Sequence, residues 1–147
     1  MGGVAPAGPS PARVLRGRCD CRAVEYEVAD EFVAAYCCHC SNCRAATGSA
    51  FLPWGEIHRE KFRVTAGLHS LARLGEDGRD HEMRCVACWS RVYWTRTAPE
   101  GVYVRIPYGT LVDEPTLKPT AHMFVGSKAS WYEILDDLPQ HDGYPWS

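Results

Sequence analysis

Eight cysteines among 147 residues constrain this chain more than any other feature of its sequence. They form a C-x-C pair at Cys19 and Cys21, a dense cluster at residues 37–43, and a C-x-x-C pair at Cys85 and Cys88. The first residues lack the basic start and apolar run of a secretory signal, so a cytoplasmic location is expected. In that reducing compartment, clustered cysteines bind metal or carry out chemistry instead of forming disulfides.

The overall composition is that of one soluble globular domain. Hydrophobic residues make up 46% of the chain, charged residues 23%, and the formal net charge is -2. This balance gives no basic field for nucleic acid, and no apolar stretch approaches the roughly 20 residues that span a bilayer. We expect residues 1–13, rich in glycine, alanine and proline, to form a flexible tail and residues 14–147 to form a single domain.

Apolar and polar residues alternate in several short segments, which is the pattern of half-buried strands. The clearest alternations lie at residues 23–28, 81–85 and 102–106. Further short runs, separated by turn-forming residues, lie at Val14–Arg18, Phe32–Cys38, Ala50–Trp54, Phe62–Thr65, Ser70–Leu74, Val92–Arg96 and His122–Val125. Many short strands with turns between them predict a mainly β fold of folded sheets.

Helical periodicity is weak along the whole chain and is nowhere sustained over three turns. Short helical turns are expected only at Asn42–Thr47, Ile57–Phe62 and Ser130–Leu138. After about residue 107, turn-forming sequences predict that the tail wraps over the sheet instead of joining it.

The first and third cysteine groups together supply four thiols, Cys19, Cys21, Cys85 and Cys88. A structural zinc site needs four tetrahedral ligands, and short C-x-C and C-x-x-C pairs each supply two from a tight turn. The long separation between the pairs is no objection, because the entropy of closing a loop grows only logarithmically with its length. The alternatives are buried, reduced cysteines or a redox pair at Cys85 and Cys88.

The central cluster predicts a different kind of site. Cys38, Cys40 and Cys43 can form a C-x-C-x-x-C tripod, whereas Cys37 points to the opposite face of an extended segment. Three protein thiolates leave the fourth position of a zinc ion open, which is typical of a catalytic zinc. A second structural zinc, completed by His122 or Cys37, and a pairing of Cys37 with Cys40 remain open.

At this point the sequence resembles a known family. The motifs that carry the resemblance are GRCDCRAVEY at 17–26, CHCSNCR at 38–44, RCVAC at 84–88, GTLVDEP at 109–115 and PTAHMFVGSKASW at 119–131. Their order and content are similar to those of the glutathione-dependent formaldehyde-activating family, which includes centromere protein V-like proteins. The resemblance implies an Mss4-like fold stapled by a structural zinc at the four outer cysteines, with a second, catalytic zinc at the tripod.

The family's chemistry, carried over by this resemblance, is that of a zinc-dependent carbon-sulfur lyase. A small thiol such as glutathione is presented to an aldehyde such as formaldehyde, and an S-hydroxymethyl-type adduct forms or is cleaved. Arg44, directly after the tripod, is predicted to bind a carboxylate of glutathione, with a solvent-facing arginine as the alternative. A different function, a noncatalytic zinc module that carries glutathione or mediates protein interaction, also fits the resemblance.

Two residues depart from the family pattern. Arg22 and Trp89 directly follow Cys21 and Cys88, at positions where glycine is common. Glycine beside a metal-binding turn allows a positive φ or a close backbone approach, so these residues put the local turn geometry in question without removing a ligand. His39 is expected to pack or to form hydrogen bonds, and Cys37 is left over as an additional thiol.

Overall fold

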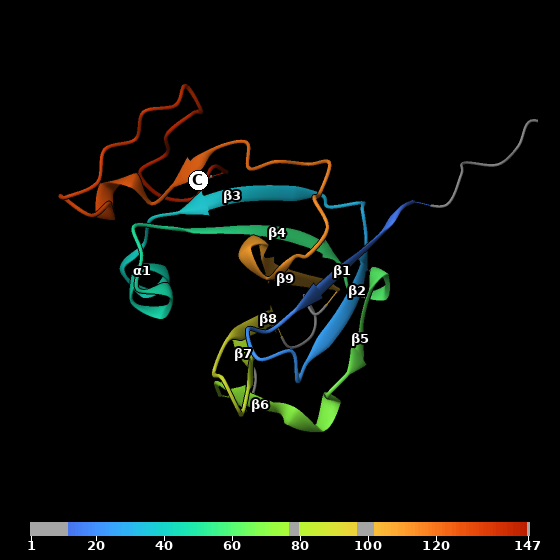
Figure 1. The fold of residues 1–147 in the computed structure, drawn as a ribbon. Coiled ribbons are helices and arrows are strands. Elements are labelled where there is room, and N and C mark those ends of the chain that lie inside the picture. The colour runs from blue at the N-terminus through green and yellow to red at the C-terminus, as the bar shows by residue number, and fades with distance from the viewer. Residues whose placement is uncertain (1–11, 77–79, 97–101, 147) are drawn as a thin grey trace, which may run out of the picture.

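Two β-sheets form the framework of the computed structural model, which describes residues 12–76, 80–96 and 102–146 (Figure 1). The smaller sheet is antiparallel, in the order β1 (Val14–Arg18), β2 (Glu25–Ala29) and β5 (Phe62–Ala66). The larger has the order β10-β3-β4-β9-β8-β7-β6. Its strands are β3 (Ala34–Cys38), β4 (Leu52–His58), β6 (Leu71–Leu74), β7 (Asp80–Cys85), β8 (Arg91–Arg96), β9 (Tyr103–Pro107) and β10 (His122–Met123). The predicted mainly β fold is confirmed.

The larger sheet is buried on both faces by different clusters. Ile57 of β4 joins the main core, which also contains residues of the smaller sheet such as Leu15, Tyr26 and Val28. Trp54 of the same strand lies on the opposite face, because side chains alternate along a strand, and it joins a second cluster with Cys38. The second cluster is the side of the sheet on which the central cysteines lie.

One of the three predicted helices is present. α1 (Ser41–Thr47) begins after Cys40, whose Sγ accepts a hydrogen bond from the Cys43 backbone N–H, and it ends at Gly48 in the left-handed conformation. A thiol thus takes the position where serine or aspartate usually caps a helix. Four short 3-10 turns complete the helical content of the described residues: η1 (Arg59–Lys61), η2 (Leu68–Ser70), η3 (Tyr108–Thr110) and η4 (Val125–Ser127).

Of the other two predicted helical turns, the one at residues 57–62 is confirmed as the single turn η1, and the one at residues 130–138 is wrong. Over residues 57–62, β4 continues to His58 because β9 pairs with it, and only the single turn η1 separates it from β5. Residues 130–138 contain no helix, and the side chains of Trp131 and Leu135 in that segment are 72% and 83% exposed. With these two large side chains in solvent, a short helix has little apolar surface to bury, and Tyr132 packs against Phe51 without one.

The C-terminal part joins the sheet, contrary to the prediction that it only wraps over it. β10 pairs in parallel with β3, with His122 opposite Cys37. Beyond β10 the chain is fastened by further backbone hydrogen bonds, in which Phe124 N–H donates to Gly143 and Val125 N–H donates to His141. In Figure 1 this segment, orange to red, lies along the β3 edge of the sheet.

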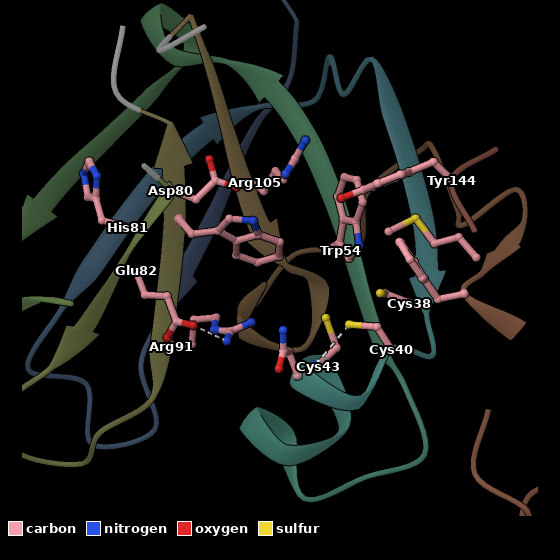
Figure 2. A pocket seen from close by; sticks show the side chains of 14 residues that line it. Cys38, Cys40, Cys43, Trp54, Asp80, His81, Glu82, Arg91, Arg105 and Tyr144 are labelled. Atoms are coloured by element: carbon pink, nitrogen blue, oxygen red, sulfur yellow. Dashed lines mark hydrogen bonds and ion pairs between the residues drawn. The ribbon is translucent and has the colours of Figure 1, made fainter. Parts of the chain in front are cut away.

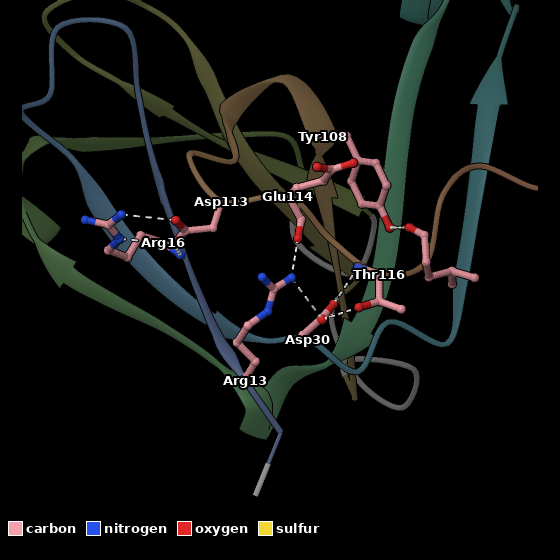
Figure 3. A network of polar contacts seen from close by, with 8 residues as sticks. Arg13, Arg16, Asp30, Tyr108, Asp113, Glu114 and Thr116 are labelled. Carbon is pink, nitrogen blue, oxygen red and sulfur yellow. Dashed lines mark hydrogen bonds and ion pairs between the residues drawn. The ribbon is translucent and has the colours of Figure 1, made fainter.

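A polar network fastens the first strand to the segment after β9 (Figure 3). Arg16 donates to Asp113 from its backbone N–H at 2.8 Å and from two guanidinium nitrogens at 3.0 Å. Asp30 accepts hydrogen bonds from Arg13 and Thr116. Arg13 is thus ordered by contacts, although the sequence places it in the tail, and residues 1–11 of that predicted tail lie outside the described residues.

Candidate metal centres

The four outer cysteines converge although 64 residues separate Cys21 from Cys85. Their Sγ atoms all lie within 4.8 Å of one another, and none forms a disulfide. Cys21 Sγ is 3.7 Å from the Sγ atoms of both Cys19 and Cys85. Four sulfurs bound tetrahedrally to zinc at about 2.3 Å would lie about 3.8 Å apart, so the group fits a zinc ion.

The turns around this group present backbone N–H groups to the sulfurs. Val24 N–H donates to Cys19 Sγ at 3.3 Å, and Ala87 N–H donates to Cys85 Sγ at 3.4 Å. Burial raises the pKa of the Cys88 thiol, but hydrogen bonds from Ser90 and from the Cys21 backbone outweigh it and lower that pKa to about 6. Donors directed at sulfur stabilise thiolates, the form that binds metal.

Arg22 and Trp89 keep the backbone conformation that glycine would supply. Their φ angles are +66° and +62°. In each case the N–H of the residue returns to the carbonyl of the first cysteine of the pair, from Arg22 to Cys19 at 3.1 Å and from Trp89 to Cys85 at 2.9 Å. The departures from the family pattern therefore change the side chains and leave the turns in the same left-handed conformation.

The tripod predicted from the central cluster also forms a compact group. The Sγ atoms of Cys38, Cys40 and Cys43 lie within 4.8 Å of one another, Cys38 at the end of β3 and Cys43 in α1. A hydrogen bond with Cys38, together with burial, raises the pKa of Cys43 well above its ordinary value. Three sulfurs this close ionise together only when a cation lies among them, and this donor set fits a zinc ion with three protein ligands.

Cys37 and His122, the two residues considered as further ligands of the central cluster, lie outside the group of three sulfurs. Cys37 is buried and paired with His122 across the β3–β10 ladder, and in the described part of the chain it belongs to neither cysteine group. His122 is likewise outside the groups, because its ring nitrogens bind His39 at 2.8 Å and Asp136 at 2.9 Å. His39 forms a hydrogen bond as predicted.

A cavity of about 350 Å³ is lined by all three central cysteines, whereas a hollow of about 500 Å³ beside the outer group is lined by Cys19 alone of its four cysteines. The lining of the first cavity also includes Trp54, Glu82, Arg91, Trp94, Arg105, Phe124 and Tyr144. Figure 2 shows the three sulfurs gathered together, with Arg91 and Glu82 to one side and Trp54 and Tyr144 to another. The central site therefore opens on a pocket that a ligand can enter.

The register of four neighbouring strands brings several of the pocket's charged and aromatic side chains onto one face of the sheet. Glu56 of β4 lies opposite Arg105 of β9, Arg105 opposite Trp94 of β8, and Trp94 opposite Glu82 of β7. Residues directly opposite one another on neighbouring strands share a face of the sheet, so the four form one row across it. Arg105 donates to Glu56 at 2.9 Å and lies 5.1 Å from the ring centre of Trp54.

Arg91 lines the pocket beside the central cysteines, and the predicted Arg44 is not among its lining residues. Arg91 contacts Glu82, lies 5.2 Å from the ring centre of Trp94, and has a buried Nε that finds no hydrogen-bond partner among the described residues. Arg44 lies on α1, donates to the His39 carbonyl at 3.4 Å, and is not among the lining residues described. Arg91 was not predicted as a site residue, because it lies directly before the predicted strand Val92–Arg96 and outside every cysteine motif.

Comparison with known proteins agrees with this geometry. The family profile of the glutathione-dependent formaldehyde-activating enzyme matches residues 14–127. The chain belongs to this family. A crystal structure of a Rhodobacter sphaeroides protein is similar, with a TM-score of 0.55 and 23% identity over 69% of this chain and 91% of that one, which shows a shared fold. A comparison with curated proteins gave no match.

Membership of the glutathione-dependent formaldehyde-activating family accounts for the positions of the seven grouped cysteines. All seven lie inside the matched range, whereas Tyr144 of the pocket lies beyond it. Among the described residues, no helix combines the length and apolar character needed to cross a membrane.

Proposed function

We propose that the chain is a zinc-dependent enzyme that joins a small thiol to an aldehyde and reverses that reaction. In the forward direction the thiol sulfur bonds to the carbonyl carbon, the carbonyl π bond breaks, and the thiol proton ends on the oxygen as a hydroxyl group. With glutathione and formaldehyde the product is S-hydroxymethylglutathione. Family membership supports glutathione and formaldehyde as the substrates.

The observation that carries the proposal is the difference between the two cysteine groups. Cys19, Cys21, Cys85 and Cys88 supply a full set of four sulfurs, while Cys38, Cys40 and Cys43 supply three and line the pocket. We assign the first group to a structural zinc and the second to a catalytic zinc. When bound at the second group, zinc would hold an incoming thiol as its nucleophilic thiolate.

The pocket residues orient the thiol substrate. Glu82 accepts hydrogen bonds from both Arg84 and Arg91, so these three side chains carry one net positive charge. The free Nε of Arg91 is therefore the group that we assign to a carboxylate of glutathione. Trp54 and Trp94 pack against each other at 5.9 Å between ring centres and exclude water from the same surface.

The location that we propose is the cytoplasm, because free thiols must stay reduced for both zinc sites to form. Seven cysteines in two groups without disulfides support this assignment.

An exchange measurement by NMR tests the activity directly. Zinc-loaded protein should accelerate the interconversion of free formaldehyde plus glutathione with S-hydroxymethylglutathione. The rate should exceed that of the spontaneous reaction. Cys43→Ser should abolish the acceleration, while Cys37→Ser, which alters the neighbouring thiol outside the group, should keep it. Exchange at the spontaneous rate with fully zinc-loaded protein would contradict the proposal and favour a noncatalytic glutathione-binding module.

A further inference from the structure

The pocket beside the central cysteines has one charged side and one apolar side. Arg91 and Glu82 line the pocket on one side of the three sulfurs (Figure 2). Trp54 and Met123 form a hydrophobic cluster with Cys38, and Phe124 packs against it. A ligand whose sulfur lies among the three cysteines would thus meet a cation in one direction and aromatic rings in the other.

The cation on the apolar side is already paired, and Asp80, which also lines the pocket, adds a negative charge. Arg105 pairs with Glu56, with side chains only 20% and 19% exposed, and its guanidinium stacks over Trp54. A guanidinium held in this way presents a flat surface and leaves no net charge for a second carboxylate. This side of the pocket is therefore suited to an uncharged, flat group.

The far wall is made by two rings from the C-terminal part of the chain. Phe124 and Tyr144 meet edge to face at 4.8 Å between ring centres, and both line the pocket. Phe124 has φ +58°, a conformation that a bulky side chain rarely adopts, and its N–H bond to Gly143 holds the segment that carries Tyr144. Strained residues of this kind gather at ligand sites, where the surrounding structure holds them in place.

Formaldehyde has no group that could use this wall. Its adduct adds only one carbon and one hydroxyl to the sulfur, whereas the pocket places Trp54, Phe124 and Tyr144 on the side away from Arg91. Tyr144 also lies beyond the range that matches the family. The apolar wall thus combines Trp54 and Phe124, which lie inside the matched range, with Tyr144, which lies beyond it.

We propose that the aldehyde partner of this chain carries an aromatic or similarly flat apolar substituent, which binds between Trp54 and the Phe124–Tyr144 wall. This inference rests on the proposed function, since it names the substrate class of the same site. The reaction is the same addition, in which the thiol sulfur bonds to the aldehyde carbon and the thiol proton passes to the oxygen. The substituent takes no part in bond making.

A binding measurement tests the wall without depending on turnover. S-benzylglutathione and S-methylglutathione are unreactive thioethers that differ only in the ring, and their dissociation constants for the zinc-loaded protein can be compared by calorimetry. The benzyl compound should bind at least about tenfold more tightly, as expected for an apolar group that fills a pocket. Equal affinities, or binding of neither compound, would overturn the inference.

Two variants test whether the Phe124–Tyr144 wall causes the preference for the benzyl compound. Tyr144→Ala should reduce the preference for the benzyl compound at least about threefold, because the side chain supplies one wall of the pocket. Leu135→Ala removes an 83% exposed side chain from the same C-terminal segment and should leave the preference unchanged. A Tyr144→Ala protein with the full preference of the parent would overturn the inference.

Turnover separates this inference from the proposed function. Phenylglyoxal and methylglyoxal are both 2-oxoaldehydes that add thiols, and they differ in the ring. The parent should accelerate addition of glutathione to phenylglyoxal at least about tenfold more efficiently than addition to methylglyoxal. Acceleration with formaldehyde and with both 2-oxoaldehydes alike would keep the proposed function and overturn the inference, whereas a benzyl preference in binding without any turnover would keep the pocket assignment and overturn the proposed function.

Discussion

His39 and His122 share a hydrogen bond of 2.8 Å between Nε2 and Nδ1, although their side chains are 0% and 2% exposed. The other nitrogen of His122 binds Asp136 at 2.9 Å, so a chain of three side chains links the segment between Cys38 and Cys40 to the C-terminal part. Buried polar groups are expensive to leave unpaired, and such a chain has one low-energy arrangement. It fixes the loop that carries two of the central cysteines.

Breaking this chain should destabilise the protein. His122→Ala leaves a buried cavity and removes the partners of both His39 and Asp136, so we expect a loss of about 2–4 kcal/mol in the free energy of unfolding. Chemical denaturation of the zinc-loaded protein measures it. His69→Ala, at an exposed position, is the matched control and should change the value by less than about 0.5 kcal/mol. A His122→Ala protein with the same free energy of unfolding as this control would show that the His39–His122–Asp136 hydrogen bonds do not stabilise the fold.

Metal content should divide the cysteines into the two groups. The parent should hold two equivalents of zinc, Cys38→Ser and Cys85→Ser should each hold one, and Cys37→Ser should keep two. Cys85 is fully buried in the main core, so loss of its zinc should also unfold the domain, because binding of a structural zinc is coupled to folding. Elemental analysis and circular dichroism of the four proteins check this. A parent protein that holds one equivalent under reducing conditions would contradict the two-site assignment.

The spacing of the cysteines was sufficient to predict both groups, because C-x-C and C-x-x-C pairs bring sulfurs together within one turn. The pocket was not predictable in the same way. Arg105 reaches Glu56 across 49 residues, and the row from Glu56 to Glu82 depends on the register of four strands. Register is set by turns and by pairing at a distance, which the local pattern of a single sequence does not specify.

The helical turn at residues 57–62 is shorter than predicted for a similar reason. Pairing of Ile57 with Val104 keeps the start of this range in β4, which leaves only Arg59–Lys61 for the turn. The strands themselves were predicted closely, since alternation in a half-buried strand is visible locally. The sequence left open whether the turns after Cys21 and Cys88 keep a glycine-like conformation without glycine. In the structure Arg22 and Trp89 both have positive φ angles, so they do.

Substitution of Trp89 tests the strain at the outer zinc group. Trp89→Ala and Trp89→Gly both remove the half-exposed indole, but only glycine adopts φ +62° without a steric cost. The glycine variant should therefore be more stable than the alanine variant by about 1 kcal/mol. Denaturation midpoints of the two zinc-loaded variants measure the difference. Equal stabilities would show that the turn relaxes when the indole is removed.

The role of Arg91 can be separated from that of Arg44 by kinetics. Arg91→Gln removes the charge beside Cys43, so the KM for glutathione should rise about tenfold or more, as expected for loss of a charge-assisted hydrogen bond. Arg44→Gln, on the outer part of α1, should change the KM less than about twofold. Saturation curves in the formaldehyde exchange assay provide both values, with zinc content measured in parallel. A larger rise in the KM for Arg44→Gln than for Arg91→Gln would contradict this assignment and indicate that Arg44 binds the glutathione carboxylate.

Titration of Asp113 tests the network that fastens β1. Hydrogen bonds from the Arg16 side chain and backbone lower the pKa of Asp113 to about 2, from an ordinary value of 3.8. Because the pKa is lower in the folded protein, the contribution of this pair to stability is fully present above about pH 4 and is lost as the pH falls towards about 2.

At pH 4, Asp113 should therefore still be ionised, and its side-chain carboxyl carbon should show no titration shift by NMR between pH 7 and pH 4. In Arg16→Gln the same carbon should begin to shift by pH 4, because the carboxyl returns towards its ordinary pKa. Arg63→Gln removes another exposed arginine that is paired with Glu27, and it should leave Asp113 unchanged. Identical titration of Asp113 in the parent and in Arg16→Gln would show that the Arg16 side chain does not hold the carboxylate in solution, and β1 would then be joined to the segment after β9 by backbone contacts such as Val112 N–H to the Arg16 carbonyl.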